Sequence, residues 1–424
     1  MEKLILMFSG AGANDAMRGQ MSAYGDALIA SGLSVVQVTA VPEELRYAAD
    51  QAIAGQVAFA VTWLGIGQDL AVEVGPEQAT RNLWEALEVP LIKIQGDLPA
   101  YFADFHGDVP RNAVNLYANS EFVHFRHRWL PDARALTGIL PPVPLMPLQR
   151  GKLNISARQQ GKLVFLKNGN SPTELQNLWR ERLPKSVGNL ISAMAHEITP
   201  VGLKPGLLHI GDFVAEFLDA TGIDPDAARD LVRFFTAQLD DYLRRLKSQM
   251  IAESLLDLPI LVQGSLWEHV DFSRRRAQLV PGQDYEATQQ IYCDQLGIID
   301  MSPNVDTAPH ERVQRAAGSY AAVLTNRQTW LNEKFPGFEE LTFEFDPESI
   351  KARASDAIAR PGRYIELGIE FGERFRALFP AAEFAARIVE VAELSALQWN
   401  AQKPAIQPFF VWPRGGDAST NSIG

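Results

Sequence analysis

Short, nearly continuous apolar runs alternate with amphipathic stretches over the first 150 residues. Nearly continuous apolar runs are typical of strands that are buried on both faces. Such strands occur in parallel sheets that are covered by helices on either side. A helical pattern at 16–31 follows the first run. The runs that we interpret as strands cover residues 3–8, 34–40, 56–64, 89–96 and 112–120. This half of the chain is therefore predicted to form a Rossmann-like α/β domain.

A proline-rich segment separates this half from a second series of strands. Residues 140–148 read LPPVPLMPL, with four prolines in nine positions. Proline cannot donate to a strand ladder and does not fit a helix interior, so we interpret the segment as a linker. Apolar runs then return, with helical patterns between them, at 162–170, 258–264, 276–282, 296–302 and 321–326. The expected fold class is α/β with two Rossmann-like domains.

The second half also contains a long stretch that reads as helix. Residues 173–256 carry almost no strand signal, and an amphipathic helix is predicted to start at Asp224, where an Asp-Pro pair supplies a cap and a helix-compatible proline. The polar tail is expected to be disordered. We therefore expect an N-terminal domain at 1–145, a C-terminal domain at 150–375 that includes the helical insertion at 173–256, a final helix within 376–412 and a disordered tail at 413–424.

Composition narrows the class of protein. The chain has 39 basic and 51 acidic residues and a net charge of −12, so we expect no nucleic-acid partner. No apolar stretch reaches the roughly 18–20 residues that a membrane-spanning helix needs. The first apolar run is also shorter than the ~7–15 residues of a secretory signal. We expect a soluble, cytoplasmic protein, with a peripheral membrane contact left open.

The sequence contains no recognisable metal motif. Its single cysteine, Cys293, excludes both a disulfide within the chain and a cysteine-based zinc site. His124 and His127 could share a helix face, but no His-Glu-x-x-His arrangement is present. Neither a Gly-x-Ser-x-Gly elbow nor a complete phosphate-binding P-loop occurs. We therefore expect no bound metal.

Two segments that follow predicted N-terminal strands could line a ligand site. SGAGAND at 9–15 places Gly10, Gly12 and Asn14 after the first strand, where small residues let the backbone approach a ligand. The segment lacks the third glycine and the ribose-binding acid of a dinucleotide fingerprint, so it indicates either an acceptor-side pocket or a close-packed turn. Asp97, in IQGDLPAYF at 94–102, follows another strand and is either a site residue or a turn residue.

Two loops in the second half also directly follow predicted strands and could line a ligand site. Lys167, Asn168 and Asn170 follow a strand and could present a positive charge and backbone amides to a phosphate. The alternative is a plain turn before a helix. In QGSLWEHVDF at 263–272, Gly264 follows the next strand and Trp267 could offer a flat face to a base or a sugar. The alternative is a tryptophan that belongs to the core.

A helix start near residue 309 has the chemistry of an anion site. The first turn of a helix carries partial positive charge and free N–H groups. His310 and Arg312 lie in this turn, and Asn304 lies in the loop before it. Together they would cradle a diphosphate leaving group. The alternative is a solvated first turn in which Glu311 is an ordinary capping acid.

These segments together resemble bacterial glycosyltransferases of the GT-B type, in particular the spore-maturation (CgeB-like) glycosyltransferase-like group. MSPNVDTAPHERVQRAAGSYAAVLTN at 301–326 is similar to the family's ISPN…HDRVFEAMACGAVVLTD. LWEALEVPLIKIQGDLPAYF at 83–102 resembles its LWE…VP…GDHP segment, and KNGNSPTELQNLWRERLP and LPILVQGSLWEHVDF lie in the right order. The resemblance covers about residues 80–330.

The resemblance implies two Rossmann-like domains that face each other across a cleft. It implies transfer of a sugar from a nucleotide-sugar donor to a hydroxyl of a glycan, lipid or protein, with no cofactor and no bound metal. The acceptor would lie on the N-terminal half. The implied donor-binding residues are Lys167, Asn168, Asn170, Gly264, Trp267, Asn304, His310 and Arg312, the acceptor-side residues are Gly10, Gly12 and Asn14, and the candidate catalytic residues are Asp97, Asp15 and His310.

Two positions depart from the family pattern. Gln314 and Arg315 stand where the family commonly has Phe-Glu, and Tyr320 stands where it commonly has glycine. In related retaining enzymes the acid contacts the donor ribose, so these changes could abolish activity or favour a donor with extra negative charge. A nucleotide-sugar epimerase of the same fold, and a non-catalytic module that binds a nucleotide sugar or a protein partner, are therefore the alternative functions.

Overall fold

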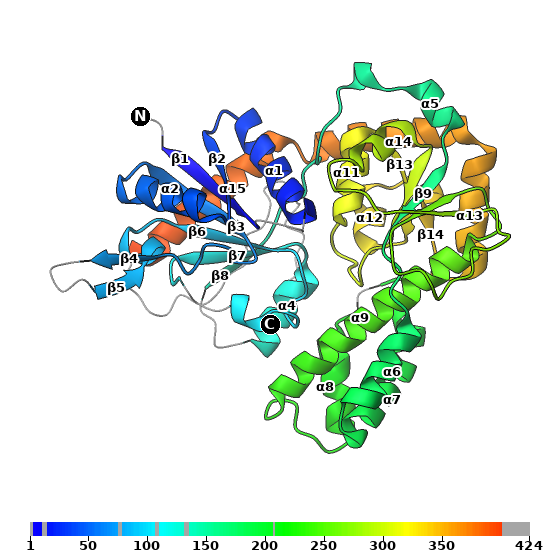
Figure 1. Cartoon of the computed structure of the whole chain (residues 1–424), viewed down its shortest axis with the longest axis horizontal. Coiled ribbons are helices and arrows are strands. Elements are labelled where there is room, and N and C mark those ends of the chain that lie inside the picture. The colour runs from blue at the N-terminus through cyan, green and yellow to red at the C-terminus, as the bar shows by residue number, and fades with distance from the viewer. Residues whose placement is uncertain are drawn as a thin grey trace.

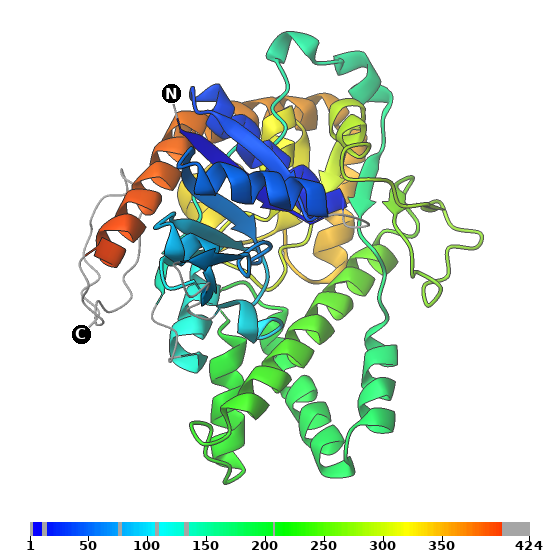
Figure 2. The ribbon, with the colours of Figure 1, turned by 60° about the vertical axis from the view of Figure 1, so that its left-hand side comes forward.

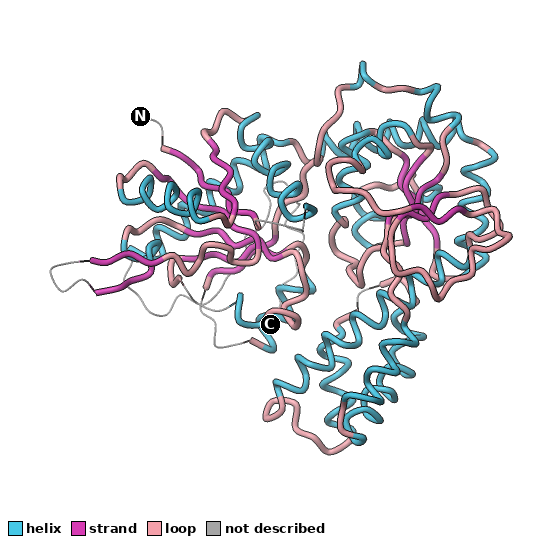
Figure 3. Tube along the Cα trace, viewed as in Figure 1, coloured by secondary structure: helices cyan, strands magenta, loops and turns pink. Residues whose placement is uncertain are grey.

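Two α/β halves make up the chain, and a helical arm projects from the second (Figure 1). The computed structural model describes residues 3–10, 15–74, 79–106, 110–130, 135–206 and 208–400. Within these residues all strands but the two of one hairpin form two six-stranded parallel sheets, which Figure 3 shows as two separate groups of magenta strands. The prediction of two Rossmann-like domains is therefore confirmed.

The first sheet has the order β2-β1-β3-β6-β7-β8, and each neighbouring pair is parallel. Its central strands are buried on both faces, which is why they read as apolar runs rather than as alternating patterns. The strands are β1 (Leu4–Ser9), β2 (Val35–Thr39), β3 (Val57–Trp63), β6 (Leu91–Gln95), β7 (Ala113–Tyr117) and β8 (Leu136–Ile139). The sequence did not indicate β8, because its four residues, LTGI, include a threonine and a glycine.

Helices connect these strands, and one hairpin lies outside the sheet. The hairpin pairs β4 (Ala71–Val74) with β5 (Ala79–Asn82) in antiparallel register. It was not predicted, since each strand has four residues and β5 is almost fully exposed. The helices of this half are α1 (Asp15–Ala30), α2 (Pro42–Ile53), α3 (Leu83–Ala86), η1 (Ala103–His106) and α4 (Ser120–Trp129).

The second sheet has the order β11-β10-β9-β12-β13-β14 and is also parallel throughout. Its strands are β9 (Leu163–Leu166), β10 (Leu261–Gln263), β11 (Gln278–Val280), β12 (Gly297–Ile299), β13 (Ala322–Asn326) and β14 (Thr342–Phe343). The connecting elements are η2 (Arg150–Lys152), α5 (Ile155–Gln160), α10 (Gln289–Asp294), α11 (Glu311–Ser319), α12 (Thr329–Lys334), η3 (Glu339–Leu341), α13 (Pro347–Ala359) and α14 (Pro361–Leu378).

Four helices between β9 and β10 form the arm, which is green in Figure 1. They are α6 (Pro172–Arg182), α7 (Lys185–Gly202), α8 (Ile210–Ala220) and α9 (Arg229–Ser254). The longest helix, α9, was predicted to begin at Asp224, but it begins at Arg229. The side chain of Asp224 accepts the N–H of Asp226 at 2.9 Å and closes a separate turn before the helix.

The arm shares a hydrophobic core with the N-terminal domain. Phe125 and Trp129 of α4 pack in one buried cluster with Ile210 and Val214 of α8. A Cβ at Gly211 would lie 2.8 Å from the ring of Phe125, so the absence of a side chain there lets the two helices approach closely. The arm therefore belongs to the second half by sequence but is anchored on the first.

The last helix returns to the first domain. Helix α15 (Ala381–Asn400) lies beside the N-terminal sheet in Figure 2. Phe384 stacks on Tyr24 of α1 with ring centroids 5.4 Å apart, and the Ser395 hydroxyl donates to the backbone oxygen of Asn112 at 2.6 Å. Residues 401–424, which include the tail expected to be disordered, lie outside the described part of the chain. Among the described helices, none is both long and apolar enough to cross a membrane.

The proline-rich segment between the sheets is bound along α11. The N–H groups of Leu145 and Leu148 donate to the backbone oxygens of Gln314 at 3.3 Å and of Gly318 at 2.8 Å. The N–H of Val143 donates to the Gln314 side chain at 3.1 Å. The residues between and directly after the prolines therefore supply the donors that proline lacks, and they fix the linker to the second domain.

Substitution of Gly318 tests this docking. A Cβ at Gly318 would overlap the carbonyl oxygen of Leu145, so we expect Gly318→Ala to lower the free energy of unfolding by about 1–3 kcal/mol despite the better helix propensity of alanine. Urea unfolding measures the difference. Gly362→Ala is the control, because that helical glycine has open space around its Cβ position. Equal stability of the two variants would show that the linker does not depend on this contact.

Candidate functional site

A cavity of about 610 Å³ lies between the two domains, and residues of both line it. On the N-terminal side these include Asp97 after β6 and Asn119 after β7. On the C-terminal side they include Lys167 after β9, Gly264 after β10 and the first turn of α11. The carboxyl ends of both parallel sheets thus face one cleft, where open α/β sheets bind their ligands.

A buried carboxylate organises the C-terminal wall. Asp300 follows β12 and is fully buried. Its Oδ1 lies 2.9 Å from Nδ1 of His310 and 3.2 Å from Nη1 of Arg312. Burial by itself would raise the pKa of Asp300, but the charges and hydrogen bonds of His310 and Arg312 outweigh this and hold it well below its usual range. The carboxylate therefore stays ionised and fixes two basic side chains at the start of α11.

The N-terminus of α11 opens on the cleft. His310 is the extended N-cap residue of this nine-residue helix, and the cavity is lined by Pro309, His310, Glu311 and Arg312. The first N–H groups of a helix have no partner within the helix, and the helix dipole adds partial positive charge at this end. This arrangement can bind an anion such as a phosphate.

Lys167 adds a titratable cation to the same wall. Burial, together with the nearby charges of Arg312 and Arg244, lowers the pKa of Lys167 to about 7. The loops after β9 and β10 lie in contact here: a Cβ at Gly264 would overlap the backbone of Lys167, and the N–H of Ser265 donates to the Asn168 side chain at 3.0 Å. Gly264 therefore has a packing role that places the lysine loop.

Asp97 lies on the opposite wall. Burial raises the pKa of this carboxyl. The positive charge of Arg244 partly offsets this increase, and the negative charge of Asp240 adds to it. Arg244 comes from α9 of the arm and is held by Asp240 through a 2.7 Å ion pair. Tyr101 donates to the same Asp240 carboxylate at 2.8 Å. Sequence reasoning missed Arg244, because a basic residue in the middle of a long amphipathic helix reads as solvated.

Five of the predicted donor-binding residues line the cleft. They are Gly264, whose role is in packing, and Lys167, Asn168, His310 and Arg312. Trp267 is buried, and its indole N–H donates to the backbone oxygen of Lys167 at 2.8 Å, so it supports the lysine loop from the core. Asn304 lies behind the wall, where its side chain contacts Asp240 and Lys247. Asn170 is not among the described residues that line the cleft.

The acceptor-side segment is described only in part. Gly10 follows β1 but is not among the described lining residues. Gly12 and Asn14 lie outside the described residues, and the side chain of Asp15 is likewise not described. Tyr24, from α1, lines the cleft. Its pKa is raised well above the ordinary range, chiefly by burial and further by the Glu311 carboxylate of the other domain. Tyr24 was not singled out from the sequence, and Glu311 was considered there only as a capping acid.

The two unusual positions of α11 have different surroundings. Tyr320 ends the helix in the left-handed conformation, with φ 55°, and packs against Arg376 at 4.1 Å, away from the described cleft wall. Arg315 does line the cleft. Its guanidinium lies 3.9 Å and 4.5 Å from the ring centroids of Tyr285 and Tyr292 and donates to the backbone oxygen of Tyr285. Tyr320 therefore does not obstruct the cavity, and Arg315 is firmly held.

Comparison with known proteins gives the fold and no closer relation. No protein-family model and no curated protein sequence matches the chain. A DNA-modifying β-glucosyltransferase, solved with and without uridine diphosphoglucose, is similar with a TM-score of 0.52 at 8% identity over 92% of this chain and 99% of that one. The T4 phage enzyme in complex with UDP-glucose gives 0.50 at 8% identity over the same shares. A sucrose-phosphate synthase from Thermosynechococcus elongatus gives 0.46 at 13% identity over 95% of this chain and 100% of that one. The chain has the GT-B fold.

Replacement of Asp300 tests the buried ion pair. We expect Asp300→Asn to lower the free energy of unfolding by about 3–5 kcal/mol near neutral pH, because it removes one partner of a buried charge pair. Folding lowers the pKa of Asp300, so its contribution is complete above the unfolded pKa of about 4 and is lost as the pH falls below that value.

The difference in unfolding free energy between the variant and the wild type should therefore stay constant above about pH 5 and shrink below about pH 4. Urea unfolding over a pH series measures it. Asp219→Asn, which replaces an exposed carboxylate of the arm, should change stability little at any pH. A difference for Asp300→Asn that did not depend on pH would contradict an ionised, paired carboxylate.

Proposed function

We propose that the protein is a glycosyltransferase that moves a sugar from a nucleoside-diphosphate donor to an acceptor hydroxyl. The observation that carries the proposal is the composition of the cleft. A helix N-terminus with His310, Arg312 and Lys167 forms one wall, and Asp97 lies on the other. Transfer of a sugar needs stabilisation of a departing diphosphate and a base for the attacking hydroxyl, and the side chains of these two walls are suited to both tasks.

The donor is assigned to the C-terminal wall. A departing diphosphate gains negative charge, and the N–H groups of α11 together with the side chains of Arg312 and Lys167 would compensate it. Because Asp300 already holds Arg312 and His310 in place, little reorganisation is needed when the charge develops. The similar fold of a phage enzyme bound to UDP-glucose supports UDP-sugars as the first donors to test.

The acceptor is assigned to the N-terminal wall, with Asp97 as the base. In an inverting transfer the acceptor oxygen forms a bond to the anomeric carbon, the bond to the diphosphate breaks with its electron pair, and the Asp97 carboxylate takes the hydroxyl proton. A pKa raised by burial suits this task, since a base works best when its pKa lies nearer the working pH. The net charge of −12 favours a glycan, lipid or protein acceptor over nucleic acid.

The direct experiment is incubation of the purified protein with a panel of nucleotide sugars and acceptor hydroxyls, followed by mass spectrometry of all products. Transfer to an acceptor, with release of nucleoside diphosphate, is the expected result. Conversion of the donor in the absence of acceptor would instead indicate an epimerase. Calorimetric binding of a nucleoside diphosphate without any turnover would indicate a binding module.

Substitution of Arg312 tests the assignment of the diphosphate. Hydrogen bonds to charged groups contribute roughly 1.5–3 kcal/mol each, so Arg312→Ala should weaken UDP binding by about one to two powers of ten. Uridine should bind the variant nearly as well as the wild type, because its contacts lie elsewhere. Calorimetry with both ligands separates the two effects.

Arg327→Ala is the control for this experiment, because Arg327 is an exposed arginine of the same domain that does not line the described cleft. It should bind UDP as the wild type does. Equal losses of UDP and uridine affinity in Arg312→Ala, or no loss of either, would mean that the diphosphate is not bound at this helix.

Substitution of Asp97 tests the base. General-base catalysis contributes about 10²–10⁴-fold, so Asp97→Asn should lower turnover by at least about 10²-fold while UDP affinity stays near that of the wild type. The wild-type rate should fall on the acid side as Asp97 becomes protonated, and the variant should lack this limb. Asp104→Asn, which replaces an exposed carboxylate of η1 in the same connection between β6 and β7, should behave as the wild type. Unchanged turnover in Asp97→Asn would reduce Asp97 to a turn residue.

A further inference from the structure

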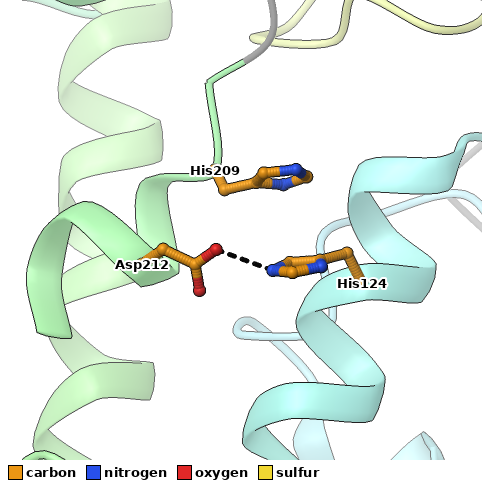
Figure 4. Close-up of side chains that lie close together, drawn as sticks. All are labelled: His124, His209 and Asp212. Atoms are coloured by element: carbon orange, nitrogen blue, oxygen red, sulfur yellow. Dashed lines mark hydrogen bonds and ion pairs between the residues drawn. The ribbon is translucent and has the colours of Figure 1, made fainter. Parts of the chain in front are cut away.

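Three potential metal ligands from two parts of the fold lie together outside the cleft. His124 lies in α4 of the N-terminal domain, His209 occupies the N-cap position of α8, and Asp212 lies in the first turn of α8 (Figure 4). Nε2 of His124 is 2.7 Å from Oδ2 of Asp212. The ring of His209 stacks over that of His124, with centroids 4.0 Å apart. None of the three lines the described part of the cleft.

The spacing of these groups is close to that of a metal centre. One donor atom from each residue lies within 4.8 Å of the other two. Around a tetrahedral zinc ion with bonds of about 2.0–2.2 Å, donor atoms are separated by about 3.3–3.6 Å. The pair of His124 and Asp212 would have to open slightly, and His209 would have to turn out of its stack, both of which are side-chain rotations. The backbone that carries them is fixed, since Phe125, Trp129 and Ile210 belong to one buried core.

The site is also accessible and has room for a further ligand. The side chains of His124 and Asp212 are 42% and 34% exposed, so an ion can enter from solvent. A cavity of about 20 Å³ lies beside the cluster and is lined by all three residues. This volume exceeds the ~10–15 Å³ that a single water needs, so a water can complete the coordination of an ion held by three side chains.

We propose that His124, His209 and Asp212 bind a divalent transition-metal ion of the zinc class. Two imidazoles and one carboxylate suit Zn²⁺ better than Mg²⁺ or Ca²⁺, which prefer oxygen ligands throughout. The hydrogen bond between His124 and Asp212 and the stacked ring of His209 already bring the three side chains together, and a metal ion would be bound by all three. Because α4 and α8 belong to different parts of the chain, the ion cross-links the arm to the N-terminal domain.

This role is structural and does not depend on the proposed sugar transfer. The ion would reinforce a junction that already includes the ion pair between Arg128 of α4 and Asp226, at 2.9 Å. Helix α4 also carries Phe122, which lines the cleft. Metal binding would therefore stabilise the relative position of the arm and the N-terminal wall without contributing a ligand to the cleft.

The test is titration of the chelator-treated full-length protein with Zn²⁺ by calorimetry and by competition with a chromophoric chelator. We expect one ion per chain and an increase in melting temperature. His124→Ala, His209→Ala and Asp212→Ala should each weaken binding by at least tenfold, because changes outside the ligands alone cost roughly 10–100-fold in metal sites. X-ray absorption of the zinc complex should show imidazole nitrogens and oxygen in the first coordination shell.

His196→Ala is the matched control, since it removes an exposed histidine from the same arm. It should bind Zn²⁺ as the wild type does, and Ca²⁺ should produce no thermal stabilisation of either protein. Circular dichroism verifies that each variant is folded. Absence of stoichiometric binding, or binding that survives both histidine substitutions, would overturn the proposal.

Discussion

The carboxylate of Asp300 holds the basic end of the cleft together. It is fully buried at the carboxyl end of β12, in the middle of the second sheet, and it contacts both His310 and Arg312. Removal of a charge from water costs several kcal/mol, so such a carboxylate is stable only when its partners remain in place. The strand, the loop after it and the first turn of α11 are therefore positioned as one unit.

The same helix also joins the two domains. One side of α11 receives hydrogen bonds from the proline-rich linker at Gln314 and Gly318. The loop before it is bound by the N-terminal domain, because Glu121 of α4 accepts the N–H groups of Asp306 at 2.6 Å and Thr307 at 3.1 Å. The N-terminus of α11 is thus fixed relative to Asp97 on the opposite wall, and contacts that lie outside the cleft hold its two walls together.

The sequence predicted most of the fold because buried parallel strands leave a direct signal. Each apolar run assigned as a strand is one, including 89–96 as β6 and 296–302 as β12. The missed strands are short: β14 has two residues, and β8 contains a threonine and a glycine. The start of α9 was misplaced because Asp224 caps a turn of its own before the helix begins.

The residues that line the cleft were predictable only where they follow a strand or begin a helix. Lys167, Asp97 and His310 were found in this way, since the carboxyl ends of parallel strands converge. Arg244 reaches the cleft from an arm whose docking on α4 leaves no mark in the sequence. Trp267 and Asn304 looked equally suitable, but one lies in the core and the other in a polar network behind the wall. Long-range packing decides these cases, and local pattern carries no information on it.

A crystal structure of the protein with UDP bound tests the central claim most directly. The account predicts a diphosphate at the N-terminus of α11, with oxygens in hydrogen-bond distance of its first N–H groups and of Arg312 or Lys167, and with Asp97 across the cleft from the β-phosphate. A nucleotide bound elsewhere, or a diphosphate that leaves the start of α11 in contact with solvent alone, would contradict it.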